Sequence, residues 1–474
     1  MTTLATQKGL HELGVAEIAA GVASGEISVL ALAETLLERI KKYDGVLQSF
    51  SYLDPDAVLD EAKTLDAEAR AGKLRGPLHG VPFGIKEQFL LEGVATRGDW
   101  KDPSPPIAEY TATVVRRLRE AGALLMGKLY MVGPSGTPPT RNPWNIEHTP
   151  GGSSSGSGAA VGARFIPFSL SEQTAGSGIR PAAYNGVAGL KPTYGRNSRY
   201  GMFQMAWSHD HACIIGYSIP DVAKVFAVTS GYDPDDPSSL PVPAANPEIN
   251  LESMRPPKVG IVRNVFPGYQ QPEMNAAIEA AAKKLAEAGA TVVDFYLPEE
   301  FELAWPLWSV VMACEGHVIN AREDAARRAA GQNVPLVSGA PTSRIVPHAI
   351  IAKGLGGLIP ATYYLQAQRI RRWLREKVDA ALASCDAIMM ATAPGAAPRD
   401  LSTSGDPSLL IPWSHLGNPA VSIPAGLDSQ GMPLGLQLVA PNMQDESLLA
   451  TAAWCEAVIG RLPAPSMDFV EAAS

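Results

Sequence analysis

Two segments near the N-terminus show the spacing of amphipathic helices. Apolar residues recur every three or four positions over residues 15–23 and 28–42, as they do along one face of a helix. In the second segment Leu36 and Ile40 belong to the apolar stripe, and Ser28 precedes it as a typical N-cap residue. The pattern therefore predicts a pair of helices at this end of the chain.

Farther along, short apolar runs alternate with longer helical patterns. The expected strands are residues 123–126, 258–262, 291–295 and 387–391. The expected helices are residues 111–120, 273–287 and 362–383. Such alternation is typical of α/β proteins, so we expect a central mixed β-sheet covered by helices on both faces.

The chain has 474 residues, which fits one large α/β unit as well as about three domains of ~150 residues. We expect a single domain over residues 1–474, with a catalytic core at about 60–230. Residues 299–360 have poorer periodicity and include Trp305 and Trp308. A substrate cap and an irregular helical layer both fit this segment.

Composition excludes several classes of protein. Hydrophobic residues make up 46% and charged residues 18%, which indicates a compact protein rather than a disordered one. The net charge of −9 argues against nucleic acid as a partner, because neutralising phosphates requires clustered lysines and arginines. The four cysteines form no metal-ligand motif. No signal-peptide pattern and no run of about 18 apolar residues occurs, so we expect a cytoplasmic protein without a membrane partner.

The most unusual stretch is GGSSSGSG at residues 151–158. Apolar segments on both sides disfavour a flexible linker. A phosphate-binding loop is disfavoured because the Walker lysine is absent and Val161 replaces the third glycine of a dinucleotide-binding motif. Residues 152–156 match G-x-S-x-G, which would make Ser154 a nucleophile. The turn-like, proline-containing segment before them does not fit the strand that this motif requires.

Two other segments combine reactive side chains with apolar strands. Lys86 ends the apolar segment GVPFGIK, and QTAGSG at 173–178 follows an expected strand at 165–170. Taken alone, Lys86 fits a solvated lysine at a strand end. Ser177 alone fits the cap of a helix that begins near Ile179.

Together these motifs resemble the amidase signature family of serine hydrolases. Its members carry a strand that ends in lysine, then GGSS[GS]GS, a TGGS-like turn and GLKPTYGR. The last motif is intact at residues 189–196, and Ser153 and Ser177 are 24 positions apart, as is typical of the family. The likeness covers nearly the whole chain, as far as NPAVSIPAG at 418–426 and the strand that follows it.

The resemblance implies a Ser–cis-Ser–Lys triad. In that triad Ser177 attacks the carbonyl carbon and forms an acyl-enzyme, Ser153 on a cis peptide bond relays the proton, and Lys86 is the base. Because a lysine is protonated at neutral pH, this role requires burial that favours the uncharged amine. The apolar residues expected to exclude water are Val81, Phe83 and Ile85. The backbone N–H groups implied for the oxyanion are those of Thr174, Ala175, Gly176 and Ser177.

The nucleophile turn departs from the commonest family version, TDTGGSIR. Arg180 follows Ser177 by three positions rather than two. In one branch of the family such an arginine holds a substrate carboxylate, but we favour a structural ion pair with Glu172 or another acid. Gly178 leaves room for a wider acyl pocket, and Ser154 is expected to support the loop.

Other polar and aromatic side chains suggest substrate or metal contacts less strongly. His209 and His211 lie close together in the sequence, but no third ligand is evident, so we expect no metal and no cofactor. A substrate pocket and an ordinary core would both hold the candidate apolar residues. These candidates are Trp100, Tyr130, Met131, Phe203, Trp207, Trp305 and Trp308.

Three functions follow from these observations. The first is an amidohydrolase that cleaves a C–N bond of a small carboxamide, acyl or aryl amide, or carbamate, with urethane or ester hydrolysis as a variant on the same triad. The second is the amidase subunit of a glutamine-dependent tRNA amidotransferase. The third is a binding protein on an inactive fold, which the intact triad disfavours. We expect a small-molecule substrate and consider a homodimer.

Overall fold

The computed structural model describes residues 9–99, 101–247, 249–329 and 359–468, with side chains described outside 320–329. Its strands are β1 (Phe50–Leu53), β2 (Pro82–Lys86), β3 (Leu124–Leu129), β4 (Phe168–Gln173), β5 (Ala188–Lys191), β6 (His211–Gly216), β7 (Lys258–Val262), β8 (Thr291–Phe295), β9 (Ala387–Ala391), β10 (Ala420–Leu427) and β11 (Pro433–Val439). Its larger helices are α1 (Val15–Ser24), α2 (Val29–Leu47), α3 (Pro55–Arg70), α4 (Thr113–Glu120), α5 (Ser155–Gly162), α6 (Ile179–Tyr184), α7 (Ile219–Thr229), α8 (Pro272–Glu287), α9 (Ala304–Ala329), α11 (Ala361–Leu382), α12 (Ile411–Leu416) and α13 (Asp445–Ile459). Short 3-10 turns are η2 (Leu10–Glu12), η3 (Pro267–Tyr269) and η4 (Glu299–Leu303).

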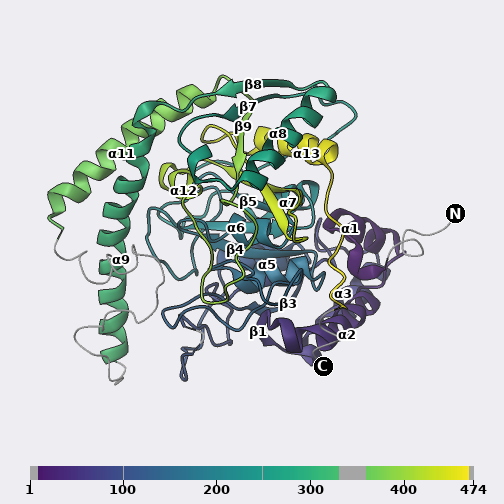
Figure 1. The fold of residues 1–474 in the computed structure, drawn as a ribbon. Helices are drawn as coiled ribbons and strands as arrows, with labels where there is room; N and C mark the ends of the chain where they lie inside the picture. Colours follow the sequence, from purple (N-terminus) through teal and green to yellow (C-terminus); the bar gives the residue numbers. More distant parts are fainter. Residues whose placement is uncertain (1–8, 100, 248, 330–358, 469–474) are drawn as a thin grey trace.

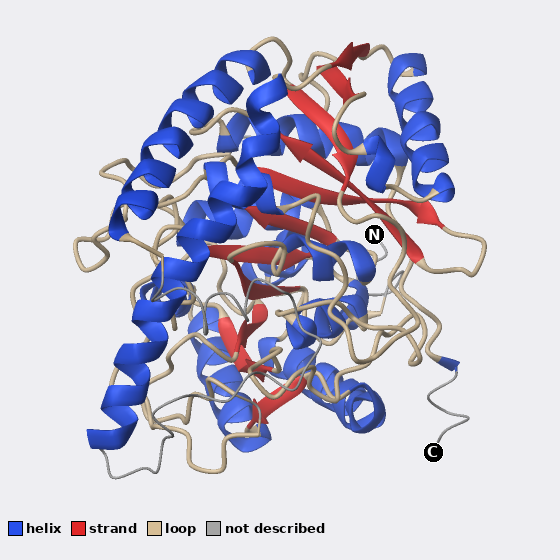
Figure 2. Ribbon diagram, turned by 60° about the vertical axis from the view of Figure 1, so that its left-hand side comes forward, coloured by secondary structure: helices blue, strands red, loops and turns tan. Residues whose placement is uncertain are grey.

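All of the described strands belong to one mixed sheet, which runs through the middle of the molecule (Figure 2). The strand order is β1-β3-β2-β4-β6-β5-β10-β11-β9-β7-β8. Strand β2 is parallel to β3 and to β4, whereas β4 is antiparallel to β6. Because β2 and β4 are parallel neighbours, their carboxyl ends lie at the same edge of the sheet. The predicted mixed sheet is confirmed.

Helices cover both faces of this sheet (Figure 1). Gly189 in β5 lies close to α6: a Cβ on Gly189 would be 2.8 Å from Ala182 Cβ in that helix. Gly216 in β6 approaches α7 in the same way, 3.1 Å from Val222. Gly189 pairs with Ile215, the neighbour of Gly216 along β6. Because consecutive residues of a strand point to opposite faces, α6 and α7 lie on opposite sides of the sheet.

Most of the predicted elements agree with the structure, including β7, β8 and β9 at the expected residues. The strand expected at 165–170 is β4, and it begins later, at Phe168. Pro167 precedes it and has no N–H to donate to a neighbouring strand, so it limits the ladder at that end. The strand continues to Gln173, which carries it directly into the nucleophile turn.

The segment with poor periodicity contains a regular helix, α9, which runs beside α11 (Figure 1). Residues 304–329 form one continuous helix, and both expectations for this segment, a substrate cap and a helical layer, stay predictions. The helix packs against both α11 and α12, and it also exposes Val318 while burying Trp308 and Met312. Apolar residues on several faces blur the helical spacing. Residues 330–358 of the expected cap lie outside the described residues, as does Trp100.

Two further features concern the helices and the cysteines of the described chain. None of the helices in the described ranges is long and apolar enough to cross a membrane. The four cysteines, all among the described residues, are free thiols.

A buried carboxyl group links α13 to the start of α7. Glu456 is 4% exposed, and its two carboxyl oxygens accept from the Ile219 backbone N–H at 3.1 and 3.2 Å. Burial raises the pKa of Glu456 from its ordinary value of 4.5 to about 7, and the Ile219 N–H offsets this only in part. The native chain therefore keeps a proton that the unfolded chain has released between these two pH values.

The variant Glu456→Gln is expected to flatten the pH dependence of stability. In the wild type this carboxyl's contribution to the free energy of unfolding is fully present below pH 4.5 and is lost as the pH rises to about 7. Glutamine has no such titration. Urea unfolding at pH 4.5, 6 and 7.5 measures the effect, and an equal decline in both proteins would contradict it.

Candidate active site

Lys86 is the last residue of β2, and its side chain is fully buried. Its Nζ lies 2.7 Å from Ser153 Oγ and 2.7 Å from Glu172 Oε2. The expectation that this lysine is shielded from water agrees with the structure, and the apolar residues assigned to that task are all buried. The contact with Ser153 is the one that the resemblance implies, whereas the Glu172 carboxylate is a partner that the sequence analysis did not predict.

The glycine- and serine-rich loop brings Ser153 to this amine. The peptide bond between Gly152 and Ser153 is cis, as the resemblance implies. Ser153 is partly exposed, and its carbonyl accepts from Val132 N at 2.9 Å. Gly156 is required by close packing, because a Cβ there would lie 2.3 Å from Ser49 O. The loop is thus ordered and pressed against its neighbours rather than a linker.

Ser154 fixes the same loop to β4. Its fully buried Oγ donates to Glu172 O at 3.2 Å and accepts from Glu172 N at 3.3 Å. Its backbone N–H donates to Ser177 O at 3.4 Å. These contacts agree with the supporting position expected for Ser154. They also hold the loop that carries Ser153 against the turn that carries Ser177.

The turn after β4 is shaped by Gln173. Its Oε1 accepts from Gly178 N at 3.0 Å and from Ile179 N at 3.1 Å, while its Nε2 donates to Ser414 Oγ at 3.0 Å. Gly178 is the N-cap residue of α6, so the interpretation of Ser177 as that cap is wrong. Ser177 instead lies in the turn and is partly exposed.

Two further contacts from α9 and α12 hold the backbone of this turn. Trp308 Nε1 donates to Thr174 O at 3.3 Å, and Ser414 Oγ donates to Ala175 O at 2.8 Å. Within the described residues, the backbone N–H groups of Ala175, Gly176 and Ser177 donate to no protein acceptor. The carbonyls of the turn are therefore engaged, whereas these N–H groups have no acceptor among the described residues.

The two serines are adjacent, but their hydroxyls are not bonded to each other. No Oγ-to-Oγ hydrogen bond between Ser153 and Ser177 occurs in the described part of the chain, and the link between them is the Ser154 N–H. Both side chains are partly exposed. Transfer of a proton between these two hydroxyls therefore stays a prediction.

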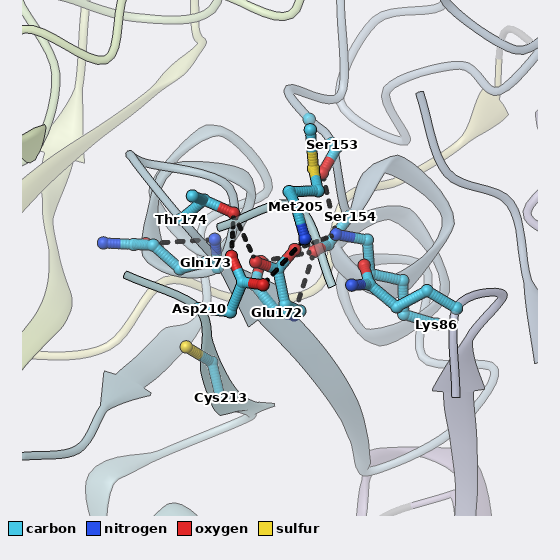
Figure 3. A network of polar contacts seen from close by, with 12 residues as sticks. Lys86, Ser153, Ser154, Glu172, Gln173, Thr174, Met205, Asp210 and Cys213 are labelled. Carbon is cyan, nitrogen blue, oxygen red and sulfur yellow. Dashed lines mark hydrogen bonds and ion pairs between the residues drawn. The ribbon is translucent and has the colours of Figure 1, made fainter. Parts of the chain in front are cut away.

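A chain of acidic and hydroxyl groups extends away from Lys86 (Figure 3). Thr174 Oγ1 lies 2.7 Å from Glu172 Oε1 and 2.8 Å from Asp210 Oδ1. Asp210 Oδ2 also accepts from Met205 N at 2.7 Å. Both acidic side chains are fully buried. Sequence reasoning did not predict this network. The available signal was a glutamate in β4, one residue before the strand ends at Gln173 and the nucleophile turn begins.

Arg180 does not form the ion pair favoured from the sequence. Its Nη1 donates to Gly405 O at 2.7 Å and its Nη2 donates to Gly152 O at 2.5 Å and Ser404 Oγ at 3.2 Å. The Glu172 carboxylate is occupied by Lys86 instead. Because both terminal nitrogens serve protein acceptors, this arrangement supports the loop rather than an anion clamp. Burial lowers the pKa of Arg180.

The remaining site candidates have structural contacts. A Cβ on Gly178 would lie 2.9 Å from Cys213 Cβ and Sγ, so the missing side chain makes room for β6 and not for a substrate. The backbone carbonyl oxygen of Tyr130 accepts from Gly156 N. The backbone carbonyl oxygen of Trp207 accepts from Tyr194 Oη. Met131 is 7% exposed. Substrate contacts by Tyr130, Met131 and Trp207 stay predictions.

The two histidines belong to the core. His209 Nε2 lies 2.9 Å from His415 Nδ1, and burial holds the pKa of His209 well below its ordinary value. His211 Nδ1 lies 3.2 Å from Gln173 O. Among the residues that the structure describes, no three His, Cys, Asp or Glu side chains are grouped so as to hold a metal ion.

Sequence comparison connects this fold and site with known proteins. A model of the family described as Amidase matches residues 31–449. The chain is 35% identical to a glutamyl-tRNA(Gln) amidotransferase subunit of Moorella thermoacetica, over 90% of this chain and 92% of the relative. It is also 35% identical to the subunit of the same name from Anaeromyxobacter sp. (strain K), over 97% and 98%.

Solved structures agree with this match. Peptide amidase from Stenotrophomonas maltophilia has a TM-score of 0.82 and 29% identity, covering 96% of this chain and 99% of that one. A structure described as a vestigial protein complex that reveals the origins of an s-triazine catabolic enzyme has a TM-score of 0.83 and 31% identity, covering 95% and 100%. The fold is that of enzymes that act on C–N bonds other than peptide bonds. The chain belongs to the Amidase family.

Proposed function

We propose that this chain hydrolyses the C–N bond of a small carboxamide through an acyl-enzyme on Ser177, with Ser153 and Lys86 moving the proton. The observation that carries the proposal is the 2.7 Å contact between the buried Lys86 amine and Ser153 Oγ, beside the partly exposed Ser177. A buried amine on one hydroxyl, next to a second hydroxyl open to solvent, is the arrangement that an activated serine needs.

In the first half of the reaction, Ser177 Oγ bonds to the amide carbon. Its proton passes to Ser153 Oγ, whose own proton moves to the uncharged Lys86 Nζ. The negative charge that develops on the carbonyl oxygen is held by backbone N–H groups of the 174–177 turn, where one well-placed donor is worth roughly 3–4 kcal/mol. The C–N bond then breaks, and the proton returns through Ser153 to the departing nitrogen.

In the second half, water cleaves the acyl-enzyme. Its proton follows the same route to Lys86 as its oxygen bonds to the acyl carbon. When the bond to Ser177 Oγ breaks, the proton returns to that oxygen, and a carboxylic acid leaves. One water is consumed, and an amine or ammonia and an acid are formed. Carbamates and esters fit the same steps with a different leaving group.

A second candidate is the amidase subunit of a glutamine-dependent tRNA amidotransferase. The observation that favours it is the 35% identity with glutamyl-tRNA(Gln) amidotransferase subunits along nearly the full length of both chains. The chemistry at Ser177 is the same, with the side-chain amide of glutamine as substrate and ammonia as product. In that case the chain works with partner subunits that bind the tRNA.

Turnover by the isolated chain separates the two candidates. The panel contains an aliphatic amide, an anilide, a carbamate, an ester, a malonamate-type acid and glutamine, with release of ammonia or amine as the readout and Ser177→Ala as the control. We expect hydrolysis of an uncharged amide without any partner. Glutamine hydrolysis that appears only after partner subunits are added would support the amidotransferase instead.

A further inference from the structure

The carboxylate beside Lys86 has a direct consequence for the proposed base. Lys86 and Glu172 are both fully buried and 2.7 Å apart. An opposite charge at this distance favours the ammonium form of a lysine. An ammonium has no lone pair for the Ser153 proton, so only the uncharged form of the Lys86 amine can act as the base. The neighbour that decides how readily this happens is Glu172.

Glu172 is itself held by a hydroxyl that it shares with a second acid. Thr174 Oγ1 lies within hydrogen-bond distance of both Glu172 Oε1 and Asp210 Oδ1. A hydroxyl has a single proton to donate, so it serves only one of these carboxyl groups. The other contact requires a proton on the second acid. The pair therefore holds one proton at the geometry observed.

Asp210 is the acid that holds this proton. Burial raises the pKa of Asp210 to about 7, and the charge of Glu172 adds to the effect. Its protonated Oδ1 can donate to Thr174 Oγ1, which then donates to Glu172. Glu172 in turn keeps the charge that Lys86 requires as a partner.

We propose that Glu172 is a positioning residue that sets the pH range in which Lys86 acts as the base, and that Thr174 and a protonated Asp210 keep its carboxylate aimed at the amine. This inference rests on the function proposed for Lys86 above. The titratable and charged side chains that face the network are Lys86 from β2, Asp210 before β6, Cys213 from β6 and Arg199. Burial raises the pKa of Cys213, which keeps it a neutral thiol.

The variant Glu172→Gln tests the inference. Glutamine has nearly the same shape but no charge, so the ammonium form of Lys86 loses its partner. We expect the acidic limb of the kcat/KM profile to move to lower pH by about 1–3 pH units, the size of shift that a contacting opposite charge produces. KM for an uncharged amide should stay within about threefold. Glu172→Thr carries the residue of the commonest family motif at this position and should shift the limb in the same direction.

The matched control is Asp210→Asn. If Asp210 is already uncharged, an amide can replace it, accepting from Met205 N and donating to Thr174 Oγ1. The limb below pH 7 should then move by less than about half a pH unit. The infrared difference spectrum between the wild type and this variant at pH 6 should show the loss of one protonated carboxyl band, that of Asp210, while the band of Glu456 remains in both proteins. This readout is independent of turnover.

The outcomes distinguish this inference from the proposed function. An active wild type and an active Glu172→Gln variant with superimposable pH profiles would overturn the inference alone. So would a folded Glu172→Gln variant that is inactive at every pH, because Glu172 would then be an obligatory proton acceptor. A wild type that turns over no member of the panel would instead overturn the proposed function.

Discussion

Replacement of Ser177 by alanine is expected to lower kcat for an amide substrate by at least about 10³-fold. No other hydroxyl of the site is placed to replace it. Ser154 is fully buried and bonded to the backbone of β4, and Ser153 lies against the Lys86 amine. Without the attacking oxygen no acyl-enzyme forms, and the residual rate comes only from binding and from the N–H groups of the turn.

The same variant should fold normally. The Ser177 side chain is partly exposed, and the bond that it contributes to the loop uses its backbone carbonyl, so removal of Oγ should change the free energy of unfolding by less than about 0.5 kcal/mol. Steady-state turnover together with urea unfolding separates the two effects. An alanine variant with more than a tenth of the wild-type kcat would remove Ser177 from the mechanism.

Replacement of Lys86 by methionine is expected to lower kcat by about 10²–10⁴-fold, the usual contribution of a general base. Methionine fills the same volume without a basic nitrogen, so the proton of Ser153 has no acceptor. Activity should recover partly at high pH, where hydroxide replaces the base. A variant with wild-type rates at neutral pH would refute the assignment.

This variant should also be destabilised, because it leaves Glu172 buried without its partner. Removing one member of a buried ion pair costs about 3–5 kcal/mol. The double variant Lys86→Met/Glu172→Gln should recover much of that stability and remain inactive. Such a result assigns the loss of stability to the unpaired charge and the loss of activity to the missing amine. Equal stability of the single and double variants would contradict the ion pair.

The parts of the site that follow from local sequence could be predicted. Lys86 ends an apolar run, and the two serines lie in motifs whose residues are close along the chain. Parallel pairing of β2 with β4 then brings the lysine and the nucleophile turn to one edge of the sheet. The alternation of strands and helices could also be predicted, because the spacing of apolar residues indicates which positions are buried.

The polar partners inside the site could not be predicted, because they depend on tertiary packing. Asp210 meets Thr174 only because β4 and β6 pair antiparallel, with Gln173 opposite His211. Arg180 was assigned to Glu172 from their proximity in sequence, but the fold gives that carboxylate to Lys86 and gives the guanidinium the carbonyls of two loops. Sequence identifies charged residues in such a case but not their partners.

The most direct test of the account is covalent trapping of the nucleophile. Folded protein is incubated with a fluorophosphonate and digested, and the modified peptide is identified by mass spectrometry, with the exposed Ser402 as an internal control. The account predicts one adduct, on Ser177, which forms more slowly in Lys86→Met and is suppressed by a substrate amide. Modification of another serine, or a folded protein that resists the reagent, would contradict it.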